Sequence, residues 1–237
     1  MSVYGWVILA TVIGPFCLSF DKKVHFHTYW RALFPALFIV GIAFLFWDEY
    51  FTQKEIWGFT PQYLAGIYIG KLPIEEVCFF LVVPYACIFI HEVLKAYFPK
   101  VNLKKFAHFF AFGFTFAGLL FGVIYLENWY TASACIISAL LTIGLYFVKK
   151  VEWYSSFVFT FIVAIIPFLI VNGILTGSFT AAPVVWYSEN HIIGLRIFTI
   201  PFEDLFYNYA MLLPLVALYE YFKKGYRTIS SGDSEKA

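Results

Sequence analysis

Charge is scarce in this sequence, because only 13% of its 237 residues are charged whereas 62% are hydrophobic. An ordinary globular domain carries about 25% charged residues, so the composition excludes a typical water-soluble domain. It predicts an integral membrane protein whose main partner is the lipid bilayer. We expect no nucleic-acid partner.

The common cofactor and nucleophile motifs are also missing. No glycine-rich turn follows a strand pattern, no phosphate-binding loop is present, and no serine or histidine arrangement is typical of a nucleophile. His25 and His27 form the only close histidine pair in the sequence, without a third ligand. We therefore expect neither a cofactor nor a metal ion. The lack of a lysine between Asp204 and Tyr221 also disfavours a retinal-binding protein.

Long apolar stretches dominate what is present. Seven of them approach the roughly 20 residues that a spanning helix needs, and they cover residues 3–20, 29–47, 73–92, 109–126, 128–148, 153–171 and 201–220. We predict an all-α, multi-pass protein of the cell membrane with seven transmembrane helices. The first stretch has no basic leader and no small-residue cleavage site, so we expect a retained helix.

Basic residues indicate the orientation in the membrane. If the loops alternate between its two sides, 13 basic residues fall on one side and three on the other. The larger set is Lys22, Lys23, Arg31, Lys95, Lys100, Lys104, Lys105, Lys149, Lys150, Lys223, Lys224, Arg227 and Lys236, and the smaller set is Lys54, Lys71 and Arg196. Because basic loops face the cytoplasm, the amino terminus is expected outside and the carboxyl terminus inside.

An acidic motif occurs twice, 128 positions apart: Leu-Pro-Ile-Glu-Glu occupies residues 72–76, and Ile-Pro-Phe-Glu-Asp occupies residues 200–204. The same register pairs Gly66 with Gly194, Ile67 with Leu195, Ile69 with Ile197, and Glu92 with Glu220. We interpret the pattern as two parallel three-helix repeats joined by a linking helix. The predicted parts are the repeats 1–100 and 128–224, the linking helix 101–127, and a polar cytoplasmic tail 225–237.

The carboxyl groups of these motifs are predicted to lie within the membrane. Only 14 residues separate Glu76 from His91 and 15 separate Asp204 from Glu220, and at about 1.5 Å per residue neither stretch spans a hydrocarbon core of about 30 Å. Ionisable groups at such depth usually mark a functional site. Helix capping is the alternative, but it accounts for one acid per helix and not for two. Neighbouring helix residues point about 100° apart, so only one acid of each pair can face a shared cavity directly.

Aromatic residues make up 23% of the chain. Ring faces stabilise cations, and a protonated carboxyl group in an apolar cavity is a proton donor. Together these features indicate carbocation chemistry on a hydrocarbon. For any single ring, the alternative is packing or a place in the aromatic belt at the membrane interface.

Motifs in both halves match one family in the family's order. In the first half they are Ser19-Phe20-Asp21-Lys22-Lys23-Val24, Trp47-Asp48, Trp57-Gly58-Phe59 and Leu72-Pro73-Ile74-Glu75-Glu76; in the second they are Asn172-Gly173, Leu175-Thr176-Gly177, Pro183-Val184-Val185-Trp186-Tyr187, Arg196 and Thr199-Ile200-Pro201-Phe202-Glu203-Asp204. Through these residues the chain resembles the small integral-membrane lycopene cyclases of the bacterial heterodimeric type, whose two subunits are fused in archaeal and fungal relatives. The resemblance covers nearly the whole chain.

The resemblance implies an isomerase of carotenoid biosynthesis, a lycopene β-cyclase that forms γ-carotene and then β-carotene. An acid protonates C2 of an end group, the C5–C6 alkene attacks the C1 cation, and a base removes the proton from C6. The implied partners are lycopene, other apolar carotenoids and further enzymes of the pathway. The alternatives are a cyclase of C50 carotenoids or of ε-rings, and a non-catalytic seven-helix carotenoid-binding or transport protein.

The implied site residues come from both halves. The catalytic candidates are Glu75, Glu76, Glu203 and Asp204, and we expect Glu75 and Glu203 to face the cavity with the other two in support. The substrate-binding candidates are Asp48, Trp57, Phe79, Phe80, Asn172, Trp186, Arg196 and Tyr207. Asp48 and Asn172 are expected to be counterparts at one cavity. Arg196 is expected to hold a carboxylate that becomes charged after proton transfer.

Overall fold

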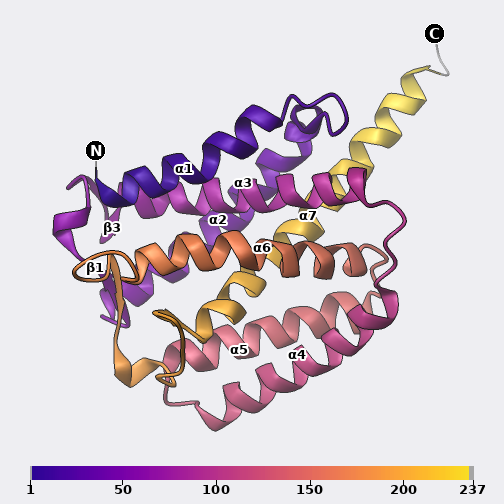
Figure 1. The fold of residues 1–237 in the computed structure, drawn as a ribbon. Helices are drawn as coiled ribbons and strands as arrows, with labels where there is room; N and C mark the ends of the chain where they lie inside the picture. The colour runs from indigo at the N-terminus through magenta and orange to yellow at the C-terminus, as the bar shows by residue number, and fades with distance from the viewer. Residues whose placement is uncertain (1, 235–237) are drawn as a thin grey trace.

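The computed structural model describes residues 2–234, with side chains through residue 226. Seven α-helices occur in this part of the chain, and they run roughly side by side (Figure 1). They are α1 (Val3–Leu18), α2 (Trp30–Gln53), α3 (Ile74–Tyr97), α4 (Lys104–Ile124), α5 (Trp129–Thr142), α6 (Tyr154–Leu175) and α7 (Glu203–Ser234). A short 3-10 helix, η1 (Phe26–Tyr29), leads into α2, and a π-helical segment, η3 (Ile143–Val148), continues α5. The predicted all-α character is confirmed.

The polar tail predicted for residues 225–237 begins inside α7, which continues to Ser234. Residues 235–237 lie outside the described part of the chain. The domain limits taken from the sequence stay a prediction.

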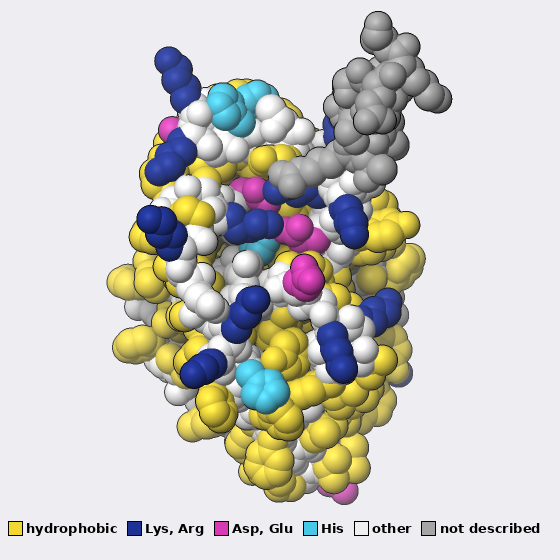
Figure 2. Space-filling model, turned by 90° about the vertical axis from the view of Figure 1, so that its right-hand side faces the viewer, with side chains coloured by type: hydrophobic (Ala, Val, Ile, Leu, Met, Phe, Trp, Pro, Cys, Tyr) yellow, Lys and Arg dark blue, Asp and Glu magenta, His cyan; other side chains and the backbone are white. Residues whose placement is uncertain are grey.

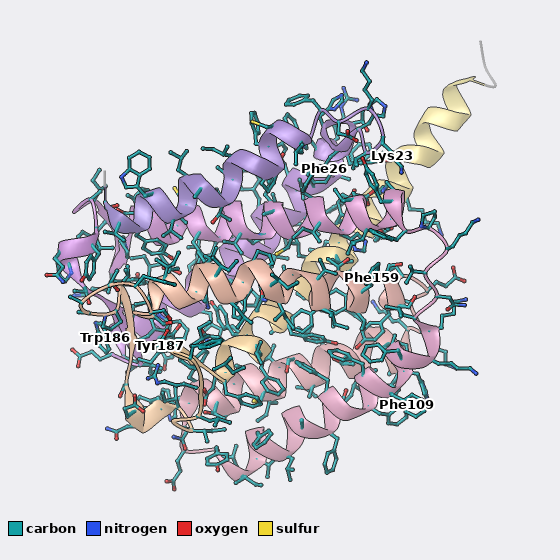
Figure 3. The ribbon with its side chains drawn as sticks, in the orientation of Figure 1. Lys23, Phe26, Phe109, Phe159, Trp186 and Tyr187 are labelled. Atoms are coloured by element: carbon teal, nitrogen blue, oxygen red, sulfur yellow. The ribbon has the colours of Figure 1, made fainter. Side chains whose placement is uncertain are left out.

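Five helical stretches are long and apolar enough to cross a membrane. They are Phe26–Gln53, Ile74–Tyr97, Lys104–Ile124, Trp129–Val148 and Tyr154–Leu175. The helix α1 is apolar but has only 16 residues. Apolar side chains point outward, as Phe109 on α4 does in Figure 3. The Phe109 side chain is 75% exposed. This pattern is that of a membrane protein.

The two ends of the molecule differ in charge. Figure 2 shows lysine and arginine side chains spread over the end that lies at the right of Figure 1. Lys23 lies at this end, whereas Trp186 and Tyr187 lie at the opposite end, among the loops that precede α3 and α7 (Figure 3). The charge asymmetry read from the sequence is therefore an asymmetry of the folded molecule.

Two lysine–glutamate ion pairs join α3 to α7 toward the basic end of the described structure. Lys95 Nζ lies 2.5 Å from Glu220 Oε1, and Lys223 Nζ lies 2.6 Å from Glu92 Oε1. Lys95 and Lys223 are 128 positions apart, as are Glu92 and Glu220. Each helix thus gives its lysine to the other helix's glutamate, which is the arrangement expected of two repeats related by a pseudo-two-fold axis.

The acidic motifs lie at the other end, where the structure adds short strands that the prediction of helices did not include. The hairpins pair β2 (Tyr68–Ile69) with β3 (Leu72–Pro73), and β5 (Arg196–Ile197) with β6 (Ile200–Pro201). Gly66 and Gly194 precede them with φ values of 81° and 84°, a conformation that glycine adopts without strain. One-turn 3-10 helices precede the hairpins, η2 (Pro61–Tyr63) and η4 (Glu189–His191). The backbone therefore repeats at the 128-residue spacing of the sequence.

A third strand pair joins the two halves directly. The strand β1 (Trp57–Phe59) pairs antiparallel with β4 (Val185–Tyr187), and Gly58 faces Trp186 at the centre. These two residues are themselves 128 positions apart, so the pseudo-two-fold axis passes between them. A Cβ atom at Gly58 would collide with the Trp186 indole, which explains why glycine is needed at this crossing.

Small residues let α4 approach α5. A Cβ atom at Gly118 would lie 2.8 Å from the carbonyl oxygen of Cys135. At Gly113, earlier on the same helix, a Cβ atom would meet nothing within 4 Å. Membrane helices commonly use small residues where their backbones come close.

We expect Gly118→Ala to lower the free energy of unfolding by about 1–3 kcal/mol, because the backbone carbonyl that it meets cannot move aside as a side chain can. Gly113→Ala is the matched control and should be neutral or stabilising by up to about 1 kcal/mol, since alanine favours a helix over glycine. Thermal unfolding in one detergent measures both variants. Equal melting temperatures would contradict the close contact between α4 and α5.

Candidate active site

The first acid of each motif holds the loop in front of its own helix. Glu75 Oε1 accepts a hydrogen bond from Ala65 N, and Glu203 Oε1 accepts one from Ile193 N, both at 2.7 Å. The two donors are again 128 positions apart. Hydroxyl groups complete the arrangement: Ser2 Oγ lies 2.5 Å from Glu75, and Thr131 Oγ1 lies 2.6 Å from Glu203.

The second acid of each motif faces the centre of the molecule. Tyr4 donates to Glu76 Oε2 at 2.5 Å, and Tyr130 donates to Asp204 Oδ1 at 2.6 Å. Both carboxyl groups line one cavity between the two halves. The expected orientation, with Glu75 and its counterpart facing inward, is therefore wrong. It fails because backbone N–H groups of the preceding loops capture the first acids and leave only the second ones, about 100° further around the helix, free to point inward.

The cavity has a volume of about 60 Å³. All seven α-helices except α4 border it or supply a hydrogen bond to its carboxyl groups. The residues that line it are Tyr4, Asp48, Trp57, Phe59, Glu76, Phe79, Val83, Tyr130, Phe168, Asn172, Leu175, Thr176, Val185, Tyr187, Asp204, Tyr207, Asn208 and Met211. Three buried carboxyl groups thus share one largely apolar space.

The two halves of the cavity are chemically different. Asp204 Oδ2 accepts further hydrogen bonds from Asn172 Nδ2 at 2.9 Å and from Tyr187 Oη at 3.1 Å. In the other half Asp48 takes the place of Asn172, and its Oδ2 atom is buried without a hydrogen-bond partner among the described residues. Asp48 is close enough to Glu76 for the two carboxyl groups to interact electrostatically. One half therefore offers two neighbouring acids, and the other offers one carboxylate with three donors.

Aromatic rings form one wall of the cavity. The ring of Trp57 lies 5.0 Å from that of Tyr130 and 5.8 Å from that of Tyr207, and the Tyr130 and Tyr187 rings stack at 5.7 Å. Burial, and then the neighbouring Asp204 carboxylate, raise the pKa of Tyr187 well above its ordinary value. Its phenol therefore stays protonated and remains a hydrogen-bond donor. Such a wall stabilises positive charge through the ring faces.

The structure brings most predicted site residues together and separates others. Asp48, Trp57, Phe79, Asn172 and Tyr207 line the cavity with Glu76 and Asp204. Three predicted substrate-binding residues lie elsewhere, and each for its own reason. Phe80 points into the helix core, because it follows Phe79 by one residue on α3. Trp186 covers Gly58 at the strand crossing.

Arg196 also lies outside the cavity. Its guanidinium donates to Glu189 Oε1 at 2.7 Å and to the Thr199 carbonyl at 2.9 Å. Because Arg196 lies on β5, in the hairpin before α7, its side chain stabilises that hairpin. The expectation that it holds a carboxylate of the acidic motifs is wrong.

Sequence reasoning missed the tyrosines that donate to the inner acids. Tyr4 lies 72 residues before Glu76 and Tyr130 lies 74 before Asp204. The 128-residue register shifts by two at these helices, so a fixed offset does not pair the two tyrosines. A search that allowed short insertions between repeats would have found them at the starts of α1 and α5.

A second polar cluster lies toward the basic end of α3 and α7. His91, Glu92 and Glu220 place ligand-type atoms within 4.8 Å of one another. Lys95 and Lys223 already pair with the two glutamates, and so supply the positive charge that a metal ion would bring. We interpret this cluster as an ion-pair network that joins the two repeats.

These features define the class of protein as an all-α membrane protein with a buried, duplicated acid site. The family model described as lycopene cyclase matches residues 1–94 and 127–222. The chain belongs to this family. The unmatched stretch between the two segments contains α4.

Two curated relatives are similar over shorter stretches. The bifunctional lycopene cyclase/phytoene synthase of Aspergillus niger is 32% identical over 72 residues, which are 28% of this chain and 12% of the relative. The protein of the same name from Aspergillus oryzae is 28% identical over 87 residues, which are 37% of this chain and 14% of the relative. The chain therefore matches only a small part of either relative's length. No solved structure gives a significant match to the chain.

Proposed function

We propose that this protein is a lycopene β-cyclase, which isomerises the end groups of lycopene to give γ-carotene and then β-carotene. One observation carries the proposal: Glu76 and Asp204, from opposite halves, face a single aromatic-walled cavity. Cyclisation needs a proton donor and a proton acceptor on one hydrocarbon, with a stabilised cation between them. Membership of the lycopene cyclase family supports the same reaction.

The proton donor is the pair formed by Asp48 and Glu76. Two neighbouring carboxyl groups in a buried site do not both ionise readily, so the pair retains a proton. Within the cavity Asp48 has a buried oxygen without a hydrogen-bond partner, and among the described residues Tyr4 is the side chain that donates to Glu76. Transfer of that proton to C2 of the end group leaves the cation at C1.

The proton acceptor is Asp204. Tyr130, Tyr187 and Asn172 each donate a hydrogen bond to it, and three donors favour a carboxylate over a neutral acid. After the C5–C6 alkene attacks the cation at C1, the new cation loses its C6 proton to Asp204. One proton is added and one is removed, so the reaction is an isomerisation that needs no oxidant or reductant.

We further propose that the chain crosses the cell membrane seven times, with its amino terminus outside. The short α1 and the long α7 complete the five apolar stretches to seven spans. The basic end in Figure 2 supports a cytoplasmic position for the loop between α3 and α4. The acid site then lies near the outer face, and lycopene and other apolar carotenoids reach it from the bilayer.

Reporter insertions test the orientation. A tag between residues 100 and 105 should read as cytoplasmic, because basic residues keep the loop between α3 and α4 on the cytoplasmic side. A tag at Asn128, in the loop before α5, should read as external. Protease protection in oriented vesicles gives an independent measurement. The reverse labelling at both sites would overturn the orientation.

Expression in lycopene-producing cells, with chromatography of the pigments, tests the activity and the site together. The wild-type chain should form β-carotene with γ-carotene as a transient. Glu76→Gln, Asp204→Asn and Asp48→Asn should each lower the rate by roughly 10² to 10⁴, the usual contribution of an acid or base. Glu75→Gln is the matched control, because a glutamine oxygen still accepts from Ala65 N and Ser2 Oγ.

We expect Glu75→Gln to keep more than about a tenth of the rate, since it transfers no proton in this account. A severe loss of cyclisation rate in Glu75→Gln together with normal turnover in Glu76→Gln would show that Glu75, and not Glu76, is the reacting acid. A product with ε-rings would show that the base removes a different proton from the one at C6. Lycopene recovered unchanged from all variants and from the wild type would favour a non-catalytic carotenoid-binding protein.

A further inference from the structure

The acid cavity is small, so only a short part of a long hydrocarbon fits into it while one end reacts. A volume of about 60 Å³ holds a few water molecules. The remainder of an extended polyene must therefore lie outside it. The loops beside the acids are polar and hydrogen-bonded to Glu75 and Glu203, which makes a route through them unfavourable for an apolar chain.

An apolar groove of about 600 Å³ lies directly beside this cavity, between α1 and α6. Its floor is α3, which lies between the two other helices in Figure 1. Five residues line both spaces: Phe79, Val83, Phe168, Asn172 and Asn208. The groove therefore adjoins the acid cavity, and Asn172, which donates to Asp204, borders both spaces.

The groove opens toward the outside of the helix bundle. Trp6 on α1 is 58% exposed and Ile170 on α6 is 59% exposed, and both stand at its rim. Along α3 it runs from Phe79 to Ile90, a length of about 16 Å at 1.5 Å per residue. Its lining is almost wholly aliphatic and aromatic, which suits a hydrocarbon.

Small side chains line the groove on three helices. They are the alanines at position 10 of α1, position 86 of α3 and position 164 of α6. With Asp48 matched to Asn172, Trp47 of α2 corresponds to Val171 of α6, which lines the groove. Trp47 packs against Phe51 at 5.8 Å and against Tyr207 at 5.1 Å. At this pair of equivalent positions α2 therefore carries a packed aromatic ring where α6 carries a smaller side chain at the groove.

We propose that this groove binds the polyene chain of the substrate while the reacting end group lies at the acids. The inference rests on the proposed cyclase function and adds the binding site for the unreacted part of the substrate. Lipid acyl chains are the competing occupant, because they share the apolar chemistry. The position of the groove directly beside the acid cavity, which a lipid does not require, favours the substrate.

Two variants on α1 test the groove. Ala10→Trp fills it from an exposed position that does not border the acid cavity. Ile13→Trp is the matched control, because Ile13 is on the same helix, is 51% exposed and does not line the groove. Each purified variant is given lycopene, or a short acyclic terpene hydrocarbon with the same end group and no long polyene.

We expect Ala10→Trp to lower kcat/KM for lycopene by about tenfold or more relative to that for the short hydrocarbon, chiefly through KM, because only lycopene needs the groove. Ile13→Trp should leave this ratio unchanged. A second arm measures binding alone, as the induced circular dichroism of lycopene in a Glu76→Gln background. Ala10→Trp should abolish that signal, and Ile13→Trp should retain it.

The outcomes separate this inference from the proposed function. Absence of cyclisation in every variant would overturn the proposed function, and the binding arm would still report on the groove. Unchanged binding and an unchanged substrate ratio in Ala10→Trp would assign the groove to lipid acyl chains and overturn the inference. Equal losses for both substrates, with a lowered melting temperature, would also overturn it, because they indicate a packing defect.

Discussion

The burial of carboxyl groups at the first turns of α3 and α7 is the constraint on which the rest of this structure depends. An ionisable group at membrane depth is costly unless donors surround it. Tyr4 and Tyr130 supply one donor each from the starts of α1 and α5. The hydrogen bonds to the inner acids therefore require α1 and α5 to begin beside α3 and α7. The loops before α3 and α7 supply backbone donors to the other acids, and each donor lies just before its hairpin.

A nearly symmetric scaffold carries an asymmetric site. The strand crossing at Gly58 and the exchanged ion pairs of Lys95 and Lys223 keep the two halves in register at both ends. Within that frame a single difference, Asp48 against Asn172, gives one half two adjacent acids and the other a buried carboxylate with three hydrogen-bond donors. Acid–base chemistry requires such a difference, because a symmetric pair of sites has no separate donor and acceptor.

Much of this arrangement follows from the sequence by simple physics. Seven apolar stretches, the 128-residue register and the depth of the acidic motifs predict the helices, the duplication and a site built from two halves. The sequence did not predict which acid of each pair faces the cavity, because this depends on which carboxylate accepts the hydrogen bond from the loop backbone. The roles of Arg196 and Trp186 did not follow either, since the hairpins and the strand crossing that hold them have no hydrophobic period in the sequence. The sequence analysis did not identify Tyr4 and Tyr130 as counterparts, because their spacing departs by two residues from the 128-residue register.

The central claim is that carboxyl groups of this chain start the reaction with an exchangeable proton and end it by removing another. The most direct measurement is cyclisation of lycopene by the purified protein in liposomes made in deuterated water, with no flavin or nicotinamide added. The account predicts cyclic product with one deuterium at C2 of each ring, and loss of that product in Glu76→Gln. Cyclic product without deuterium, or a strict requirement for a reduced flavin, would contradict it.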